Sequence, residues 1–125
     1  MPSLTKSMSS EKVATTPVVS FDYLETFKIC LDDAASFLRL AGTEPKPVLS
    51  AVLEKFEEKV GSFPLSCPIS SQLLELGVSK YRECLVGNYR IFFSYSEKSY
   101  CVTVYALVSQ RQDIQKILYR RLVLI

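Results

Sequence analysis

The spacing of apolar residues changes near Gly77, and this change limits the folds open to the chain. Before Gly77, apolar side chains recur every three or four residues over two stretches, which is the period of amphipathic helices. After it they alternate over three consecutive stretches rich in Tyr, Phe, Val, Ile and Thr, as in half-buried strands. Helices followed by a block of strands are typical of an α+β domain.

The predicted order of elements is β-α-α-β-β-β with a short C-terminal helix over 111–121. A strand is expected at 17–21, where Pro17 suits the start of a strand or an edge strand. The two helical stripes are Leu24, Phe27, Leu31, Ala34, Leu38 and Ala41, and then Leu49, Val52, Leu53, Phe56 and Val60. Gly42 and Gly61 are expected to end these helices, and the segment 43–47 between them is interpreted as a break.

Three antiparallel strands are predicted over 78–86, 88–96 and 100–109, joined as a meander. In the middle strand, alternation places Arg90 on the face opposite Tyr89 and Ile91. The helical hairpin is expected to pack on one face of this small antiparallel sheet and to leave the other face partly open.

One domain is expected over 17–125, after a flexible leader at 1–16 that is rich in Ser, Thr and Lys and lacks aromatic residues. A chain of 125 residues can bury one core without metal or disulfide support. The leader has no apolar region of the signal-peptide kind, and no apolar run approaches the ~18 residues of a membrane span. A cytoplasmic protein is therefore predicted.

The chain contains no histidine, which excludes Ser-His-Asp catalysis, Cys-His catalysis and His-ligated zinc. Its cysteines, Cys30, Cys67, Cys84 and Cys101, include no Cys-x-x-Cys pair. Buried, reduced thiols are favoured over a metal site, and no metal or cofactor is expected.

The formal net charge of +2 conceals two halves of opposite sign. Residues 21–61 carry eight acidic and five basic side chains, a net of −3, whereas residues 78–125 carry eight basic and three acidic ones, a net of +5. A basic sheet and tail suit an acidic or polyanionic partner, although a solvated surface without a partner has the same composition.

Arg82 and Arg90 lie on adjacent predicted strands, and Arg111 opens the segment after the third strand. If the three guanidinium groups converge at one end of the sheet, their planar forks suit phosphate or carboxylate. The alternative is local pairing, for instance of Arg82 or Arg90 with Glu83 or with a helix carboxylate. For any single arginine, local pairing is favoured.

The run over 81–114 resembles the RelE/ParE superfamily of bacterial type II toxins. It carries the Gly-x-Tyr-Arg-Ile element of that family at 87–91 and a valine-rich strand that ends at Arg111. The resemblance spans 17–118, and the order and lengths of the predicted elements agree with it. It implies a cognate antitoxin that packs a helix on the toxin and adds a strand to its sheet edge.

The resemblance implies different activities in its two branches. RelE-like members cleave messenger RNA on the ribosome with strand lysines, two arginines and a C-terminal tyrosine. In this sequence the arginines are Arg90 and Arg111, whereas the lysine positions correspond to Arg82 and Cys84 and the tyrosine position to Ile117. Two catalytic roles are therefore unfilled.

ParE-like members instead poison DNA gyrase by binding it, and the sequence departs from the ribonuclease pattern in that direction. The favoured hypothesis is a ParE-like toxin that is not itself an enzyme. Its expected target-binding residues are Arg90, Arg111, Lys116, Arg120 and Arg121. Two alternatives remain: a RelE-like ribonuclease acting on ribosome-bound RNA, and a non-toxic interaction module of the same fold. The ribonuclease would use Arg82, Arg90, Arg111 and Tyr119, with Tyr119 as the only plausible general base.

Overall fold

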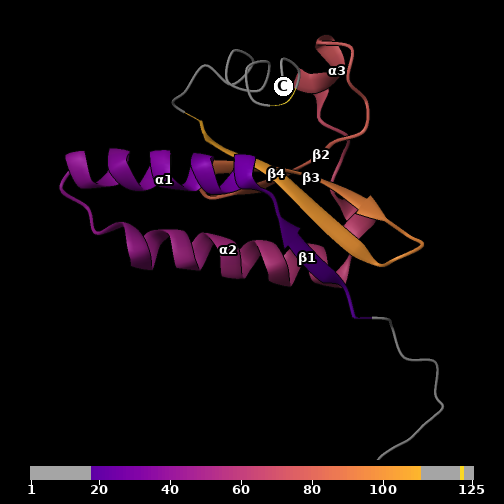
Figure 1. The fold of residues 1–125 in the computed structure, drawn as a ribbon, viewed down its shortest axis with the longest axis horizontal. Coiled ribbons are helices and arrows are strands. Elements are labelled where there is room, and N and C mark those ends of the chain that lie inside the picture. Colours follow the sequence, from indigo (N-terminus) through magenta and orange to yellow (C-terminus); the bar gives the residue numbers. More distant parts are fainter. Residues whose placement is uncertain (1–17, 111–121, 123–125) are drawn as a thin grey trace, which may run out of the picture.

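The computed structural model describes residues 18–110 and residue 122. They form a four-stranded sheet, a hairpin of two long helices and a short third helix (Figure 1). The elements are β1 (Ser20–Tyr23), α1 (Glu25–Leu40), α2 (Pro45–Ser62), the 3-10 turn η1 (Pro64–Ser66), α3 (Ser71–Glu75), β2 (Arg82–Val86), β3 (Tyr89–Ser96) and β4 (Cys101–Ser109). The predicted α+β class is confirmed; the leader at 1–16 and the helix over 111–121 lie outside the described residues.

The two long helices end where glycine or loop residues stop the helical period. Gly42 follows α1 with a φ of +80°, a left-handed conformation that glycine adopts without a steric penalty. The segment 43–47 is not wholly a break, because α2 already begins at Pro45. A proline fits the first helical position, where its missing N–H has no partner to lose.

The sheet has the strand order β1-β4-β3-β2. The predicted meander is confirmed, since β2 pairs with β3 and β3 with β4 in antiparallel fashion. At the far edge β1 lies parallel to β4, with Ser20 opposite Cys101 and Tyr23 opposite Val104. Parallel strands need a long connection, and the helical hairpin between β1 and the meander supplies one. The sequence predicts an antiparallel sheet, so the parallel pairing of β1 with β4 differs from that prediction.

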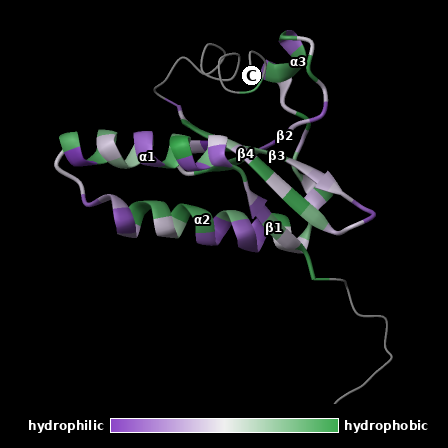
Figure 2. Ribbon diagram, in the orientation of Figure 1, coloured by the Kyte–Doolittle hydropathy of each residue, from purple (hydrophilic) through white to green (hydrophobic). Residues whose placement is uncertain are grey.

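One face of the sheet, here called the helix face, packs against α1 and α2 (Figure 1). Phe56 of α2 lies at its centre, with ring centroids 5.8 Å from Phe21 and 5.7 Å from Phe93. The ring centroids of Phe27 in α1 and Tyr23 are 5.1 Å apart. Figure 2 shows polar and apolar residues alternating along both helices and apolar residues along much of β4, as burial of one side of each helix requires.

The other face, here called the opposite face, is not open at its centre. Phe92, Ala106 and Val108 point to this face and are fully buried. The expectation of a partly open face is therefore wrong for these positions. A β-bulge lies here, because Phe92 pairs with Ala106 and Phe93 with Val104, which leaves Tyr105 without an opposite residue.

Candidate functional site

A short segment beside β2 covers the start of that strand's outer edge. Ile69 lies opposite Arg82 in an antiparallel bridge. The Glu83 N–H donates to the Pro68 carbonyl at 2.9 Å, and the Ser70 N–H donates to the Tyr81 carbonyl at 2.8 Å. Because α3 follows directly, this segment also fixes the position of that helix next to β2.

Arg90 belongs to a chain of polar contacts on the opposite face. Its guanidinium forms an ion pair with Glu83, and the other Glu83 oxygen accepts from the Ser70 hydroxyl at 3.1 Å. The Ser70 Oγ in turn accepts from the Leu73 N–H at 3.3 Å and so caps the start of α3. The Arg90 and Glu83 side chains are 29% and 12% exposed. The structure therefore shows Arg90 in a local pair with Glu83, the predicted alternative to convergence of the three arginines.

Arg82 lies on the helix face and is engaged separately. Its Nη1 donates to the Cys67 carbonyl at 2.6 Å. Arg82 pairs with Phe93, whereas Arg90 pairs with Leu85, three residues further along β2. Because successive side chains alternate between faces, an offset of three places the two arginines on opposite faces. The structure does not bring them together. The other predicted site residues, Arg111, Lys116, Tyr119, Arg120 and Arg121, lie outside the described residues.

Sequence reasoning missed a cluster of a lysine and two tyrosines. The Tyr81 and Tyr105 rings meet edge to face with centroids 4.7 Å apart. Lys80 Nζ lies 5.1 Å from the Tyr81 centroid and 5.8 Å from that of Tyr105, within cation–π range. The Tyr105 hydroxyl is 3.1 Å from Ser94 Oγ, so the cluster shares the opposite face with Arg90. Tyr105 shares the face of Thr103 by simple alternation, but the meeting of Tyr105 with Lys80 and Tyr81 depends on pairing between distant strands, for which the sequence gives no local signal.

The opposite face thus combines a paired guanidinium with a lysine ammonium and phenol groups. Arg90 is not saturated, because its Nε is buried and makes no hydrogen bond with any residue in the described part of the chain. A guanidinium N–H without a partner can donate a hydrogen bond to one more oxygen atom. Any anion at this site would have to share Arg90 with Glu83, which lowers the attraction for it.

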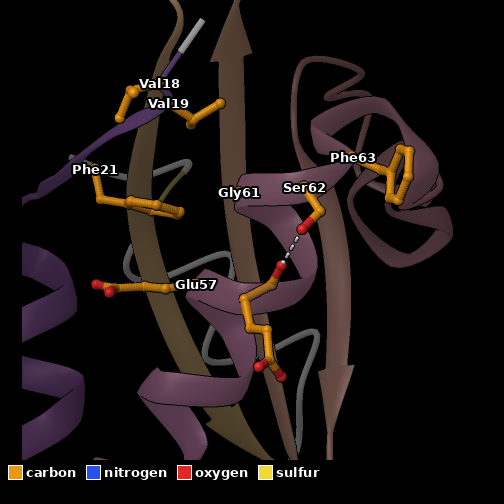
Figure 3. Close-up of a pocket in the computed structure, with 8 residues that line it drawn as sticks. Val18, Val19, Phe21, Glu57, Gly61, Ser62 and Phe63 are labelled. Atoms are coloured by element: carbon orange, nitrogen blue, oxygen red, sulfur yellow. Dashed lines mark hydrogen bonds between the residues drawn. The ribbon is translucent and has the colours of Figure 1, made fainter. Parts of the chain in front are cut away.

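A shallow hollow of about 660 Å³ lies between β1 and the end of α2 (Figure 3). Figure 3 shows Val18, Val19 and Phe21 on one side and Phe63 on the other, with Gly61 between them. Glu57 lines it too, and its carboxylate accepts a hydrogen bond from Tyr23. Burial and this bond raise the pKa of Tyr23 well above its usual range.

A second hollow of about 600 Å³ adjoins the first at Phe63. It is lined mainly by apolar side chains, among them Leu65, Tyr95 and Tyr100. Phe63 stands between the two hollows and is 71% exposed. Exposed aromatic and aliphatic groups beside carboxylates suit a protein segment better than a phosphate.

Residues 18–110 hold no group of three or more side chains that could bind a metal ion. None of the four cysteines forms a disulfide; Cys101 is half-buried and the other three are buried. In the same part of the chain, each helix is too short or too polar to cross a bilayer.

The likeness to known proteins lies in the fold rather than in the sequence. No family model matches the sequence, and no curated protein matches it significantly. A chain from the crystal structure of the toxin-antitoxin complex RelBE2 of Mycobacterium tuberculosis superposes with a TM-score of 0.55. The match covers 74% of this chain and 99% of that chain at 16% identity. The predicted RelE-like fold is confirmed, whereas membership of the ParE branch stays a prediction.

Proposed function

We propose that this chain is the toxin of a toxin–antitoxin pair and that it arrests growth by binding its target rather than by cutting RNA. The target carried over from the family resemblance is DNA gyrase, and the compartment is the cytoplasm. One observation carries the choice of binding over cleavage: Arg82 and Arg90 lie on opposite faces, and each is held by a partner within the chain.

Cleavage by the resembling ribonucleases needs several cations around one phosphate. Arg82 is turned toward Cys67 on the helix face, away from Arg90. Arg90 carries its charge next to Glu83, which offsets it. These two positions therefore favour a binding surface, to which we assign Arg90 together with Arg111, Lys116, Arg120 and Arg121.

The same proposal places a cognate antitoxin on two features of the described chain. Since β1 occupies the outer side of β4, the free edge of the meander is β2. Its first residues are covered by the 68–70 segment, so strand addition would begin near Leu85, which is 49% exposed. Exposed Ile29, Phe37 and Leu40 offer an apolar stripe on α1 for an antitoxin helix.

A RelE-like ribonuclease is the second candidate, favoured by the lysine–tyrosine cluster. Lys80, Tyr81 and Tyr105 share a face with Arg90, and the Arg90 Nε–H has no acceptor among the described residues. This cluster would supply a cation and a phenol without any histidine. The fold likeness to a chain of RelBE2 fits this candidate as well as the first.

Induction of the chain alone in bacteria separates these functions. Growth arrest with trapped gyrase–DNA complexes and intact transcripts is the expected result. Arrest with new transcript 5′ ends and no trapped gyrase would replace the first candidate by the second. Normal growth at confirmed expression would leave only the non-toxic module.

A charge-swapped variant gives a matched test of Arg90. Glu83→Arg combined with Arg90→Glu keeps an ion pair between the same two positions but moves the guanidinium from β3 to β2. We expect this variant to stay folded and to lose the arrest. If the charge-swapped variant still arrests growth, Arg90 has a structural role only.

A further inference from the structure

Cys67 and Cys84 face each other across the sheet edge. The bridge between Ile69 and Arg82 and the bonds beside it define an antiparallel register in which position 67 lies opposite position 84. In that register the hydrogen-bonded pairs are 68 with 83 and 70 with 81, so 67 with 84 is a non-hydrogen-bonded pair. Cα atoms in such pairs are about 4.5 Å apart, within the span that a disulfide bridges.

We propose that Cys67 and Cys84 form a dithiol oxidation site that a peroxide closes to an intramolecular disulfide. Both thiols are free in the structure, and both are buried on the helix face beneath the end of α2. The inference is independent of the toxin proposal, because it concerns the attachment of the 67–70 segment to β2.

The surroundings of Cys67 activate it as the attacking group. The Cys84 thiol donates a hydrogen bond to the Cys67 sulfur, and this bond lowers the pKa of Cys67 to about 6 against the effect of burial. Lys59 and Arg82 supply positive charge, and Ser66 a further hydrogen bond. The same bond and burial raise the pKa of Cys84. A thiolate beside a protonated thiol is the arrangement of an attacking and a resolving cysteine.

The reaction has two steps. The Cys67 thiolate attacks one oxygen of hydrogen peroxide, the O–O bond breaks, and hydroxide leaves, so that Cys67 becomes a sulfenic acid. The Cys84 sulfur then attacks the Cys67 sulfur, the S–O bond breaks, and the Cys84 proton leaves with the oxygen as water. The hydroxide takes up the proton that Cys67 gave up on ionising. In total, two thiols are oxidised, one peroxide is reduced and two waters form.

A small oxidant suits the site because Cys67 is 3% exposed while its neighbours on both sides, Ser66 and Pro68, are exposed. A slight displacement of this surface segment would uncover the sulfur. Once formed, the disulfide would fasten the 67–70 segment to β2 and, through Ser70, hold the Glu83–Arg90 pair in place.

Peptide mapping under non-reducing conditions tests the proposal directly. The folded protein is treated with hydrogen peroxide at pH 7, quenched with an alkylating reagent and digested with trypsin. Cleavage after Lys59, Lys80, Arg82 and Arg90 puts Cys67 in peptide 60–80 and Cys84 in peptide 83–90. We expect these two peptides joined, lighter by two hydrogen atoms, and formed roughly tenfold faster than any product at Cys101, whose neighbours across the sheet are Ser20 and Ser96 rather than a second cysteine.

Two variants keep the result interpretable. The Cys30→Ser/Cys101→Ser double variant retains the pair and should give the same joined peptides. In Cys84→Ser, oxidation should stop at a Cys67 sulfenic acid that dimedone traps. If wild-type protein keeps Cys67 and Cys84 free while Cys101 is oxidised, or joins Cys101 to other cysteines at the same rate, the proposal is wrong.

Discussion

Arg82 and Arg90 lie on neighbouring strands, yet the pleat of the sheet sends them to different surroundings. On the helix face, Arg82 holds a carbonyl of the 67–70 segment beneath α2. On the opposite face, Arg90 pairs with Glu83 and keeps one donor without a partner among the described residues. Similar strand positions thus carry a structural arginine on one face and a partly available one on the other, and face rather than residue type decides the role.

The largest effect is expected from the core of the helix face. Phe93→Ala removes a fully buried ring that packs edge to face on Phe56. We expect the free energy of unfolding to fall by about 3–5 kcal/mol, because the cavity cannot close. Urea denaturation followed by circular dichroism measures it. Phe63→Ala, which removes the same ring at an exposed site, should change it by no more than about 0.5 kcal/mol.

Breaking the polar chain of the opposite face should have a smaller effect. Glu83→Gln leaves Arg90 half-buried without its carboxylate and weakens the cap of α3 through Ser70. A loss of about 1–2 kcal/mol is expected, less than for a fully buried ion pair, because Arg90 is partly solvated.

A double-mutant cycle sharpens this measurement. Arg90→Met should lower the free energy of unfolding less in the Glu83→Gln background than in wild type. Arg82→Met should lower it by the same amount in both backgrounds. Equal coupling of Glu83 to both arginines would contradict the assignment of the two side chains to different faces.

The sequence predicts the elements better than it predicts the site, and the reason is physical. Period and glycine positions follow from local chemistry, so both long helices and the three-stranded meander were predicted within a few residues. The parallel return of β1 and the pairing of the 68–70 segment with β2 depend on contacts between distant parts of the chain. Local periodicity carries no information about either.

The site was harder to predict because it depends on one irregularity and one register. The bulge leaves Tyr105 without an opposite partner and puts Ala106 on the same face, which alternation cannot anticipate. The meeting of Tyr105 with Tyr81 and Lys80 depends on the pairing of distant strands. Convergence of Arg82 and Arg90 was a reasonable hypothesis for adjacent strands. Only the register, with an offset of three, excludes it.

A smaller, pH-dependent effect is expected at β1 on the helix face. The folded state raises the pKa of Tyr23 by burial and by the bond to Glu57. Above the unfolded value of about 10, the unfolded chain loses this proton while the folded chain keeps it, so stability is full below pH 10 and falls as pH rises. Tyr23→Phe should therefore show a shallower decline of the urea midpoint between pH 9 and 11 than wild type. Parallel declines would contradict the shift.

Lys80→Gln should have the smallest effect on stability and still separate the two faces. It removes a cation over the Tyr81 and Tyr105 rings at an exposed position, a loss of about 0.5 kcal/mol or less. If the opposite face is the working surface, arrest on induction should weaken although the protein stays folded. Lys55→Gln makes the same charge change at an exposed position of α2, and it should leave the arrest intact because α2 packs on the helix face. Equal weakening by both variants would mean that overall charge, rather than the opposite face, attracts the target.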